Sequence, residues 1–318
     1  MRNKKHIIVT LSATLSILIL ILFGSSEYFL HFALNNDNSG YNAKNEFDKV
    51  KADYPWIASW VDSIRSNKLL RDSFIINRDG KKMHAWYVPS PKSTGNTAVI
   101  VHGYKSNSVE MMHIGYMFNH DLQWNILLPD LLAHGKSEGH TIQMGWEDRK
   151  DVMQWTRVAH GIFSSDTIIV HGISMGASTA MCFAGDENLE YIRGFIEDCG
   201  YTSAWDEFKG EIKKQFGLPS FPILNIASLL SKIQYGWSFD EASSLNQVEK
   251  SKLPMLFIHG SSDTYVPTSM VYSLYKAKPE PKDIWIASGS IHAKSYEDHH
   301  EEYTERTKAF INKYINKK

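Results

Sequence analysis

The pentapeptide Gly-Ile-Ser-Met-Gly at 172–176 constrains this sequence more than any other feature. It lies between a β-branched run, Thr167–Val170, and a stretch of small residues, Ala177–Met181. A serine that joins a buried strand to a helix through such a turn has a strained backbone. The residues two positions before and after it must be glycine to avoid collision. The pattern therefore predicts a strand, a sharp turn that exposes the Ser174 hydroxyl, and a helix.

Strands and helices alternate on both sides of this turn. Two runs, Arg71–Ile76 and Met83–Val88, flank Asp79-Gly80, which is typical of a hairpin. Apolar runs and segments of helical periodicity then follow one another along the chain, which indicates a mostly parallel sheet flanked by helices. The expected strands are 97–101, 125–129, 167–170, 192–196, 255–258 and 283–287, and the expected helices are 109–118, 146–160 and 303–315.

An insertion interrupts this alternation between the strands expected at 192–196 and 255–258. It is roughly 55 residues long and rich in Phe, Trp, Leu and Lys. A single helical crossover between parallel strands needs far fewer residues. We therefore expect a helical cap at about residues 203–250, within a catalytic domain that spans 71–318.

The first 34 residues have the composition of a membrane segment. Three basic residues precede an apolar run from Ile7 to Phe23, and the apolar character continues from Tyr28 to Leu34. About 17 apolar residues is the lower limit for a spanning helix and the upper limit for a signal-peptide core. Gly24-Ser25-Ser26 is a weak cleavage site without an A-x-A pattern. We expect residues 1–34 to be an uncleaved anchor with Tyr28–Leu34 in an aromatic belt.

The basic residues at the start predict that the N-terminus lies inside the cell and the catalytic domain outside. The alternative is a protein that is secreted after signal cleavage. Residues 35–70, which are polar with interspersed aromatic residues, are expected to form a spacer and a helix or two against the domain.

Composition narrows the range of partners. The formal net charge is −1 and no long basic run occurs, whereas a nucleic-acid surface needs clustered Lys and Arg. The two cysteines, Cys182 and Cys199, have neither CxxC nor CxxH spacing, so we expect no metal site and no cofactor. The expected partners are a small ester or short peptide and, through residues 1–34, a membrane. The sequence does not indicate the oligomeric state.

A serine hydroxyl is a poor nucleophile until a base removes its proton. Asp263 follows the strand expected at 255–258, and His292 follows the last expected strand, which gives the chain order Ser, Asp, His. We expect His292 to accept the proton of Ser174 and Asp263 to fix the tautomer of His292. Asp198, which follows the strand expected at 192–196, is the alternative acid.

The oxyanion of an acyl-transfer intermediate needs two backbone N–H donors. One is expected from Met175, the residue after the nucleophile. The other is expected from Tyr104, in the loop after the strand at 97–101. Two alternatives remain: the Tyr104 side chain lines the acyl pocket instead, or His102-Gly103 merely turns the chain.

Several of these motifs together resemble the α/β-hydrolase superfamily. They are Val101–Tyr104, Asp130–Ser137, the 172–176 turn, Asp198–Ser203 and the surroundings of Asp263 and His292. The closest group is the membrane-anchored or extracytoplasmic hydrolases of Gram-positive bacteria, which are similar to serine aminopeptidase-like and Bem46-like proteins. The resemblance covers about residues 70–318. It implies an oxyanion loop of His-Gly-x type, since the His-Gly-Gly-Gly loop of one esterase and lipase branch is absent.

The expected activity is hydrolysis of a carboxylic ester through an acyl-enzyme on Ser174. The first alternative is a serine peptidase that acts at a peptide N-terminus, which would need a carboxylate near the pocket to hold an α-amino group. The second is a non-catalytic surface-binding protein that kept the fold.

Overall fold

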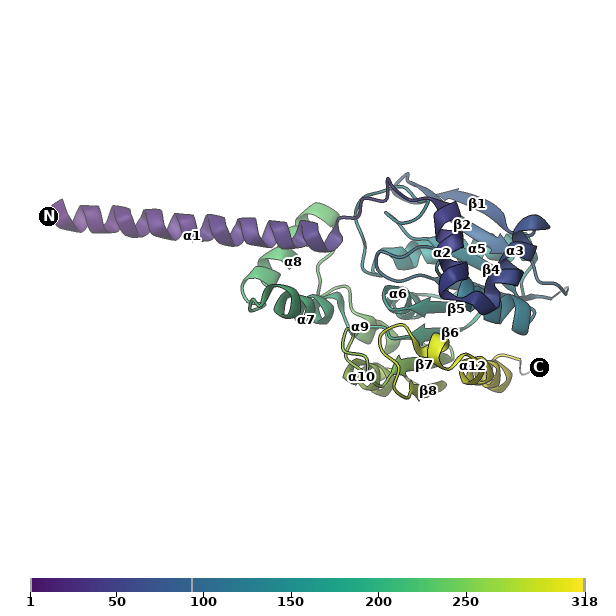
Figure 1. The fold of residues 1–318 in the computed structure, drawn as a ribbon. Helices are drawn as coiled ribbons and strands as arrows, with labels where there is room; N and C mark the ends of the chain where they lie inside the picture. The colour runs from purple at the N-terminus through teal and green to yellow at the C-terminus, as the bar shows by residue number, and fades with distance from the viewer. Residues whose placement is uncertain (1, 93, 317–318) are drawn as a thin grey trace.

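The computed structural model describes residues 2–92 and 94–316, and its centre is an eight-stranded sheet between two layers of helices (Figure 1). The strand order is β1-β2-β4-β3-β5-β6-β7-β8. The two hairpin strands pair antiparallel, β2 also pairs antiparallel with β4, and all the other neighbours are parallel. This is the expected α/β-hydrolase fold. The strands are β1 (Arg71–Ile76), β2 (Lys82–Val88), β3 (Asn96–Val101), β4 (Asn125–Asp130), β5 (Thr167–Ile173), β6 (Ile192–Asp198), β7 (Met255–Gly260) and β8 (Lys282–Ala287).

Each face of the sheet has its own apolar core, because successive side chains of a strand point to opposite faces. In β3, Val99 and Val101 belong to one core, and Ala98 and Ile100 belong to the other. The first core is closed by α5 (Asp148–Phe163), α6 (Met175–Ala184), α9 (Ser244–Val248) and α10 (Ser269–Ala277). The second is closed by α2 (Ala43–Asp53), α3 (Ala58–Ser66), α4 (Met112–Tyr116) and α12 (His300–Tyr314). The short element η1 (Pro55–Ile57) joins α2 to α3, and α11 (Ser295–Asp298) lies between β8 and α12.

The helix expected at 109–118 differs from the prediction. The α-helical part is limited to α4, which continues into a π-helical turn, η2 (Met117–Asp121). The turn places the buried side-chain amide of Asn119 where it donates to the carbonyls of Pro89 (3.1 Å) and Trp124 (2.9 Å). These tertiary hydrogen bonds satisfy a buried polar group, and the helical periodicity of the sequence does not reveal them.

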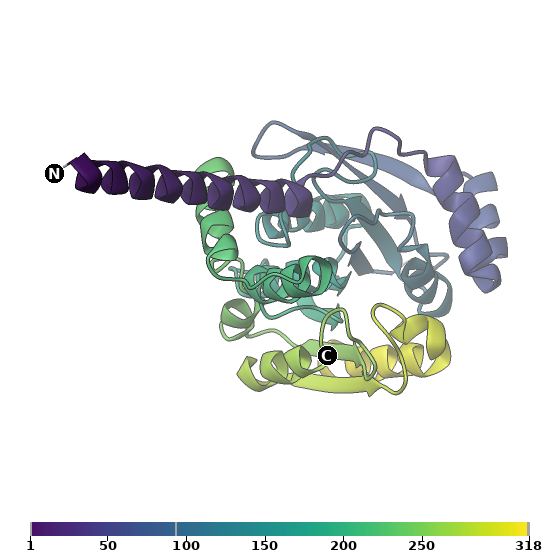
Figure 2. The same ribbon diagram turned by 60° about the vertical axis from the view of Figure 1, so that its left-hand side comes forward.

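The segment expected to form the cap contains three helices. The two longer ones, α7 (Ala204–Phe216) and α8 (Ile223–Tyr235), project from the sheet next to α1 (Figures 1 and 2). The Ser203 side chain accepts a hydrogen bond from the Asp206 N–H at the start of α7, and Gly217 ends that helix in the left-handed conformation. The third helix, α9, packs against α6.

The N-terminal segment is one continuous helix, α1 (Arg2–Leu34), and it is long and apolar enough to cross a membrane. Its first part extends away from the body of the protein, whereas its C-terminal end lies against α7 and α8 (Figure 2). The aromatic-belt prediction for Tyr28–Leu34 is wrong for four of these residues, because a helix exposes one face and buries another. Tyr28 and Phe32 are exposed, but Phe29, Leu30, Ala33 and Leu34 are buried in the core of the hydrolase domain.

Candidate active site

Ser174 lies at the tip of the turn between β5 and α6, at the carboxyl end of the sheet. Its backbone has φ 57° and ψ −116°, a conformation that an L-residue adopts only when its surroundings enforce it. The Ser174 N–H donates to the carbonyl of Asp198 (2.8 Å), and the Ser174 carbonyl accepts from the Ser178 N–H (3.0 Å). These bonds hold the side chain where only a small part of the residue is exposed.

The two glycines of the turn leave no space for a side chain. A Cβ on Gly172 would lie 2.0 Å from the carbonyl oxygen of Gly176. A Cβ on Gly176 would lie 2.1 Å from the carbonyl oxygen of Val101 in β3. Both contacts are with backbone atoms that cannot rotate away. The glycines therefore allow the close packing of β5, α6 and β3 on which the Ser174 conformation depends.

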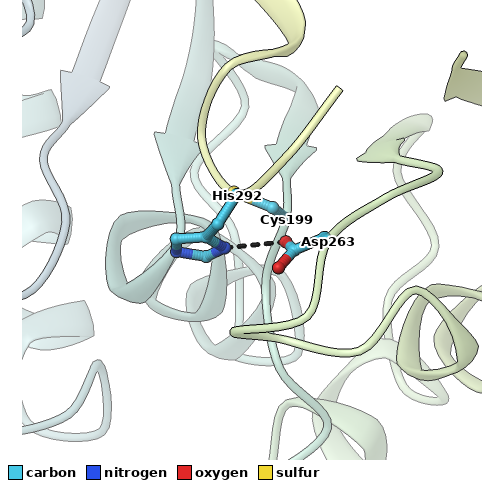
Figure 3. A group of neighbouring side chains, drawn as sticks. All are labelled: Cys199, Asp263 and His292. Carbon is cyan, nitrogen blue, oxygen red and sulfur yellow. Dashed lines mark hydrogen bonds and ion pairs between the residues drawn. The ribbon is translucent and has the colours of Figure 1, made fainter. Parts of the chain in front are cut away.

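The structure brings the three residues singled out from the sequence into one hydrogen-bonded chain. His292 Nε2 lies 2.8 Å from Ser174 Oγ, and His292 Nδ1 lies 2.7 Å from Asp263 Oδ2. Figure 3 shows the His292 ring facing the Asp263 carboxylate, each carried by a loop beyond the strands. Since a carboxylate accepts, Nδ1 carries the proton and Nε2 is free to accept the Ser174 hydroxyl. The arrangement has the parts that nucleophilic catalysis by a serine requires.

Asp263 is held by more partners than the sequence indicated. Its Oδ1 accepts the N–H groups of Tyr265 (2.9 Å) and Val266 (3.0 Å). His259 Nε2, from the end of β7, lies 3.3 Å from Oδ2. Burial alone would raise the pKa of Asp263, but the hydrogen bonds from His259 and His292 outweigh it and hold the pKa at about 2. The sequence does not indicate that His259 contacts Asp263, because only the tertiary fold shows which loop the His259 ring faces.

Asp198 is also buried at the end of its strand, but it has different neighbours. Its Oδ1 accepts the Ser295 hydroxyl at 3.2 Å, and within the described part of the chain no hydrogen bond joins it to His292. Burial raises the pKa of Asp198 to about 6, far above that of Asp263. Because the surroundings of Asp198 favour its neutral form more than those of Asp263 do, Asp198 is less suited to stabilise an imidazolium.

The loop after β3 passes directly over Ser174. A Cβ on Gly103 would lie 3.4 Å from Ser174 Cβ, so the backbone of this loop lines the space in front of the hydroxyl. The loop is fixed by His134 Nε2, which accepts the Lys105 N–H (3.1 Å), and by Asp130, which accepts the Ser108 N–H (2.8 Å). The Tyr104 hydroxyl donates to the Ala33 carbonyl at 2.7 Å. The expected oxyanion loop is thus tied to the end of α1.

Two cavities meet at Ser174 and differ in character. The first, with a volume of about 500 Å³, is lined by charged groups that include Lys49, Asp53, Glu110 and Lys294. The second is narrow, about 50 Å³, and is lined mainly by apolar side chains. Its lining residues from α1 and α7 are Phe29, Phe32, Ala33, Glu207, Phe208, Glu211, Gln215 and Phe216. Tyr104 lines both cavities, so its side chain is part of the pocket wall.

Cys199, Asp263 and His292 are close enough together to hold a metal ion (Figure 3). Binding one would require His292 and Asp263 to give up the hydrogen bond between them. It would also need a thiolate, but burial raises the pKa of Cys199 well above its usual value. These three side chains are therefore better described as a neutral Cys199 thiol next to the hydrogen-bonded pair of His292 and Asp263 than as a metal-binding site.

Comparison with known proteins agrees with this geometry. The model of the prolyl oligopeptidase family matches residues 137–318, which is more than half of the chain. The chain belongs to this family. YqkD of Bacillus subtilis is 32% identical over 226 residues, which are 71% of this chain and 74% of that protein.

Solved structures with the same fold include both esterases and peptidases. The esterase Pf2001 of Pyrococcus furiosus superimposes with a TM-score of 0.64 at 21% identity, over 80% of this chain and 94% of that one. The acylaminoacyl peptidase of Pyrococcus horikoshii gives a TM-score of 0.59 at 16% identity, over 81% of this chain and 44% of that one. This chain therefore belongs to the prolyl oligopeptidase family and has the hydrolase fold. The fold alone does not distinguish an esterase from a peptidase.

Proposed function

We propose that this protein is a serine hydrolase that cleaves carboxylic esters through an acyl-enzyme on Ser174. The observation that carries the proposal is the continuous chain of hydrogen bonds from Asp263 through His292 to Ser174 Oγ, with distances of 2.7 and 2.8 Å. A chain of this kind moves a proton away from the hydroxyl as the oxygen forms a new bond.

The reaction has two halves. In the first, His292 Nε2 takes the proton of Ser174 while Oγ adds to the ester carbonyl, and the N–H groups of Met175 and Tyr104 stabilise the oxyanion. The intermediate collapses, and the leaving alcohol takes the proton from His292. In the second half, His292 removes a proton from water, the hydroxide releases the acid, and the proton returns to Ser174. Because its pKa is about 2, Asp263 stays ionised and stabilises the imidazolium in both halves.

The apolar pocket favours an ester over an N-terminal peptide. An α-amino group would need a free carboxylate there, and the pocket contains Glu207 and Glu211. Burial raises the pKa of Glu207 to about 8, so this side chain is neutral at pH 7. Glu211 is paired with Lys214 at 3.5 Å. Within the apolar pocket, therefore, neither carboxyl offers an unpaired charge to an α-amino group. A peptide N-terminus would have to lie in the charged cavity, which Asp53 and Glu110 line.

The family match supports a second candidate, a serine peptidase. Its site has the same nucleophile and base, but it would have to protonate an amine as the leaving group. The two candidates are distinguished by the ratio of kcat/KM for a p-nitrophenyl ester to that for an aminoacyl-p-nitroanilide. A ratio in favour of the anilide would replace the ester proposal by the peptidase.

The nucleophile is tested by labelling with a fluorophosphonate probe. We expect the full chain to be labelled and to hydrolyse p-nitrophenyl butyrate, and Ser174→Ala to lose both properties. Ser178→Ala is a suitable control, since Ser178 lies one turn further along α6 and is fully buried. Labelling that persists in Ser174→Ala would disprove the assignment.

We further propose that α1 stays attached as a single-pass anchor with the hydrolase domain outside the cell. Two features support this. Gly24-Ser25-Ser26 lies inside a continuous helix rather than in an extended segment, and Ser26 is buried with its hydroxyl donating to the Leu22 carbonyl at 2.8 Å. We expect the protein purified from membranes to have the mass of the chain with residues 1–24 present. A mass that lacks them would show cleavage.

A further inference from the structure

A second apolar cavity adjoins the pocket beside Ser174. It lies between α1, the end of α7 and the start of α8, and its volume is about 400 Å³. We call it the α1 groove. The residues that line it are Ile21, Gly24, Ser25, Tyr28 and Phe29 of α1, together with Ile212, Phe216, Leu218 and Ile223.

Two phenylalanines separate the α1 groove from the pocket beside Ser174. Phe29 and Phe216 line both cavities, and their ring centroids are 6.3 Å apart in an edge-to-face arrangement. The pocket beside Ser174 holds only about 50 Å³, which suits a short acyl group. Rings at this distance are in contact, so a longer chain that starts at Ser174 enters the groove only when Phe29 and Phe216 move apart.

The groove lies where α1 leaves the membrane in the proposed topology. A hydrocarbon core of about 30 Å takes up roughly 20 helical residues. Counted from His6, where the apolar stretch begins, this length ends close to Ser25. The groove residues of α1 run from Ile21 to Phe29. In this topology Ile21 and Gly24 lie within the hydrocarbon core and Tyr28 and Phe29 lie just beyond it, so the α1 wall of the groove crosses the bilayer surface.

The cap has the exposed apolar side chains that this position requires. Phe221, just before α8, is 74% exposed, and Ile233 on α8 is 71% exposed. Leu218 and Leu229 are also exposed. Such side chains in one region of a surface mark an interaction with a partner or a membrane. Because α8 crosses α1 and packs against it (Figures 1 and 2), the membrane that holds α1 is the surface they would meet.

We propose that the substrate is an ester of a long-chain fatty acid that remains in the bilayer. Its acyl chain lies in the α1 groove and reaches Ser174 between Phe29 and Phe216. Its alcohol part lies in the charged cavity that Ser174 also lines, where the ion pairs of Lys49 with Glu110 and of Lys294 with Glu297 offer polar groups. This inference rests on the proposed ester hydrolysis and adds the substrate class and the role of α1 as one wall of the binding site.

The test compares two esters with the full chain in lipid vesicles. p-Nitrophenyl butyrate fits the pocket beside Ser174 alone, whereas p-nitrophenyl palmitate must use the groove. Gly24→Trp fills the groove, since a Cβ at Gly24 meets no atom within 4 Å. Leu20→Trp adds the same ring to α1 at an exposed position outside the groove. Phe216→Ala opens the partition.

The measured quantity is the ratio of kcat/KM for palmitate to that for butyrate. We expect Gly24→Trp to lower this ratio at least about 10-fold, since each methylene excluded from apolar burial is worth about 4-fold. We expect Leu20→Trp to keep the wild-type ratio and Phe216→Ala to raise it. The butyrate rate reports whether the two tryptophan variants are folded. For Phe216→Ala, whose side chain lines the butyrate pocket, the circular dichroism spectrum reports folding.

Two results would overturn the inference. If the two tryptophan variants have the same ratio while butyrate hydrolysis still depends on Ser174, the groove does not hold the acyl chain and the proposed function stands. If the wild-type chain hydrolyses neither ester, or does so without Ser174, the proposed function and the inference both fail.

Discussion

Replacing Asp263 by asparagine is expected to move the proton on His292 while the loop around it stays intact. The Oδ1 atom of Asp263 accepts the N–H groups of Tyr265 and Val266, so an asparagine must keep its carbonyl oxygen there. Its NH₂ group then faces Nδ1 of His292 at the position now occupied by Oδ2. Because two donors cannot face each other, His292 must carry its proton on Nε2. In that tautomer the ring cannot accept the proton of Ser174.

The magnitude follows from this loss of the base. A triad whose histidine is held in the wrong tautomer loses about 10⁴ in kcat, which corresponds to roughly 5 kcal/mol of transition-state stabilisation. We expect kcat of Asp263→Asn with p-nitrophenyl butyrate to fall by about 10³ to 10⁴. The circular dichroism spectrum should remain that of the wild type, because the two backbone hydrogen bonds persist.

Asp198→Asn is the matched control. Asp198 is buried at the end of the neighbouring strand, and its carboxyl accepts a hydroxyl that an asparagine oxygen accepts equally well. Burial raises the pKa of Asp198 to about 6, so its surroundings stabilise the carboxylate poorly and replacing it by a neutral amide costs little. We expect a loss of less than about 10-fold. A loss in Asp198→Asn that equals or exceeds that in Asp263→Asn would refute this reasoning and make Asp198 the acid.

Three further predictions concern folding and stability. Gly176→Ala should fail to give a folded chain, because its Cβ would lie 2.1 Å from a carbonyl oxygen. The control is Gly210→Ala on α7, where a Cβ meets nothing within 4 Å, and it should melt within a few degrees of the wild type. The pKa of Glu207 is raised to about 8 from 4.5 by burial, so the folded protein binds more protons between these values and the free energy of unfolding falls as pH rises through this window. Glu207→Gln should make the decline in melting temperature from pH 5 to pH 8 shallower, and an unchanged slope would contradict the assignment. A chain of residues 35–318 should lose about 5 kcal/mol or more of unfolding free energy in urea relative to a chain of residues 25–318, at about 1.5–3 kcal/mol for each large side chain removed from the core. The large buried apolar side chains that the shorter chain lacks are Phe29, Leu30 and Leu34.

The sheet could be predicted because its signals are local. The central strands β3, β4, β5 and β7 are mainly apolar or β-branched runs. They are buried on both faces, so their residues show little polar interruption. The turn at Ser174 could be predicted for the same reason, since both glycines are required by contacts within or next to the turn. The order Ser174, Asp263, His292 then followed from the ends of these strands.

Contacts between distant segments could not be predicted. His259 faces Asp263 only because the loop after β7 folds back over the strand end, and its place beside a glycine in the sequence does not show this. The π-helical turn of η2 places Asn119 where it donates to the nearby carbonyl of Trp124 and to the carbonyl of Pro89, 30 residues earlier in the chain. The state of Glu207 depends on burial by α7 and its neighbours, which no charge pattern along the chain records.

The first helix separates the two kinds of information most clearly. Its length, its apolar composition and the basic residues before it are properties of consecutive residues, and they indicated a membrane segment without any structure. The last turns of this helix also form a wall of the pocket beside Ser174. They do so because Phe29 contacts Phe208 and Phe216, and because the Tyr104 hydroxyl donates to the Ala33 carbonyl. These partners lie about 70 to 190 positions away in the sequence. A helix face that packs against protein and one that lies in lipid both consist of apolar residues, so the sequence does not distinguish them.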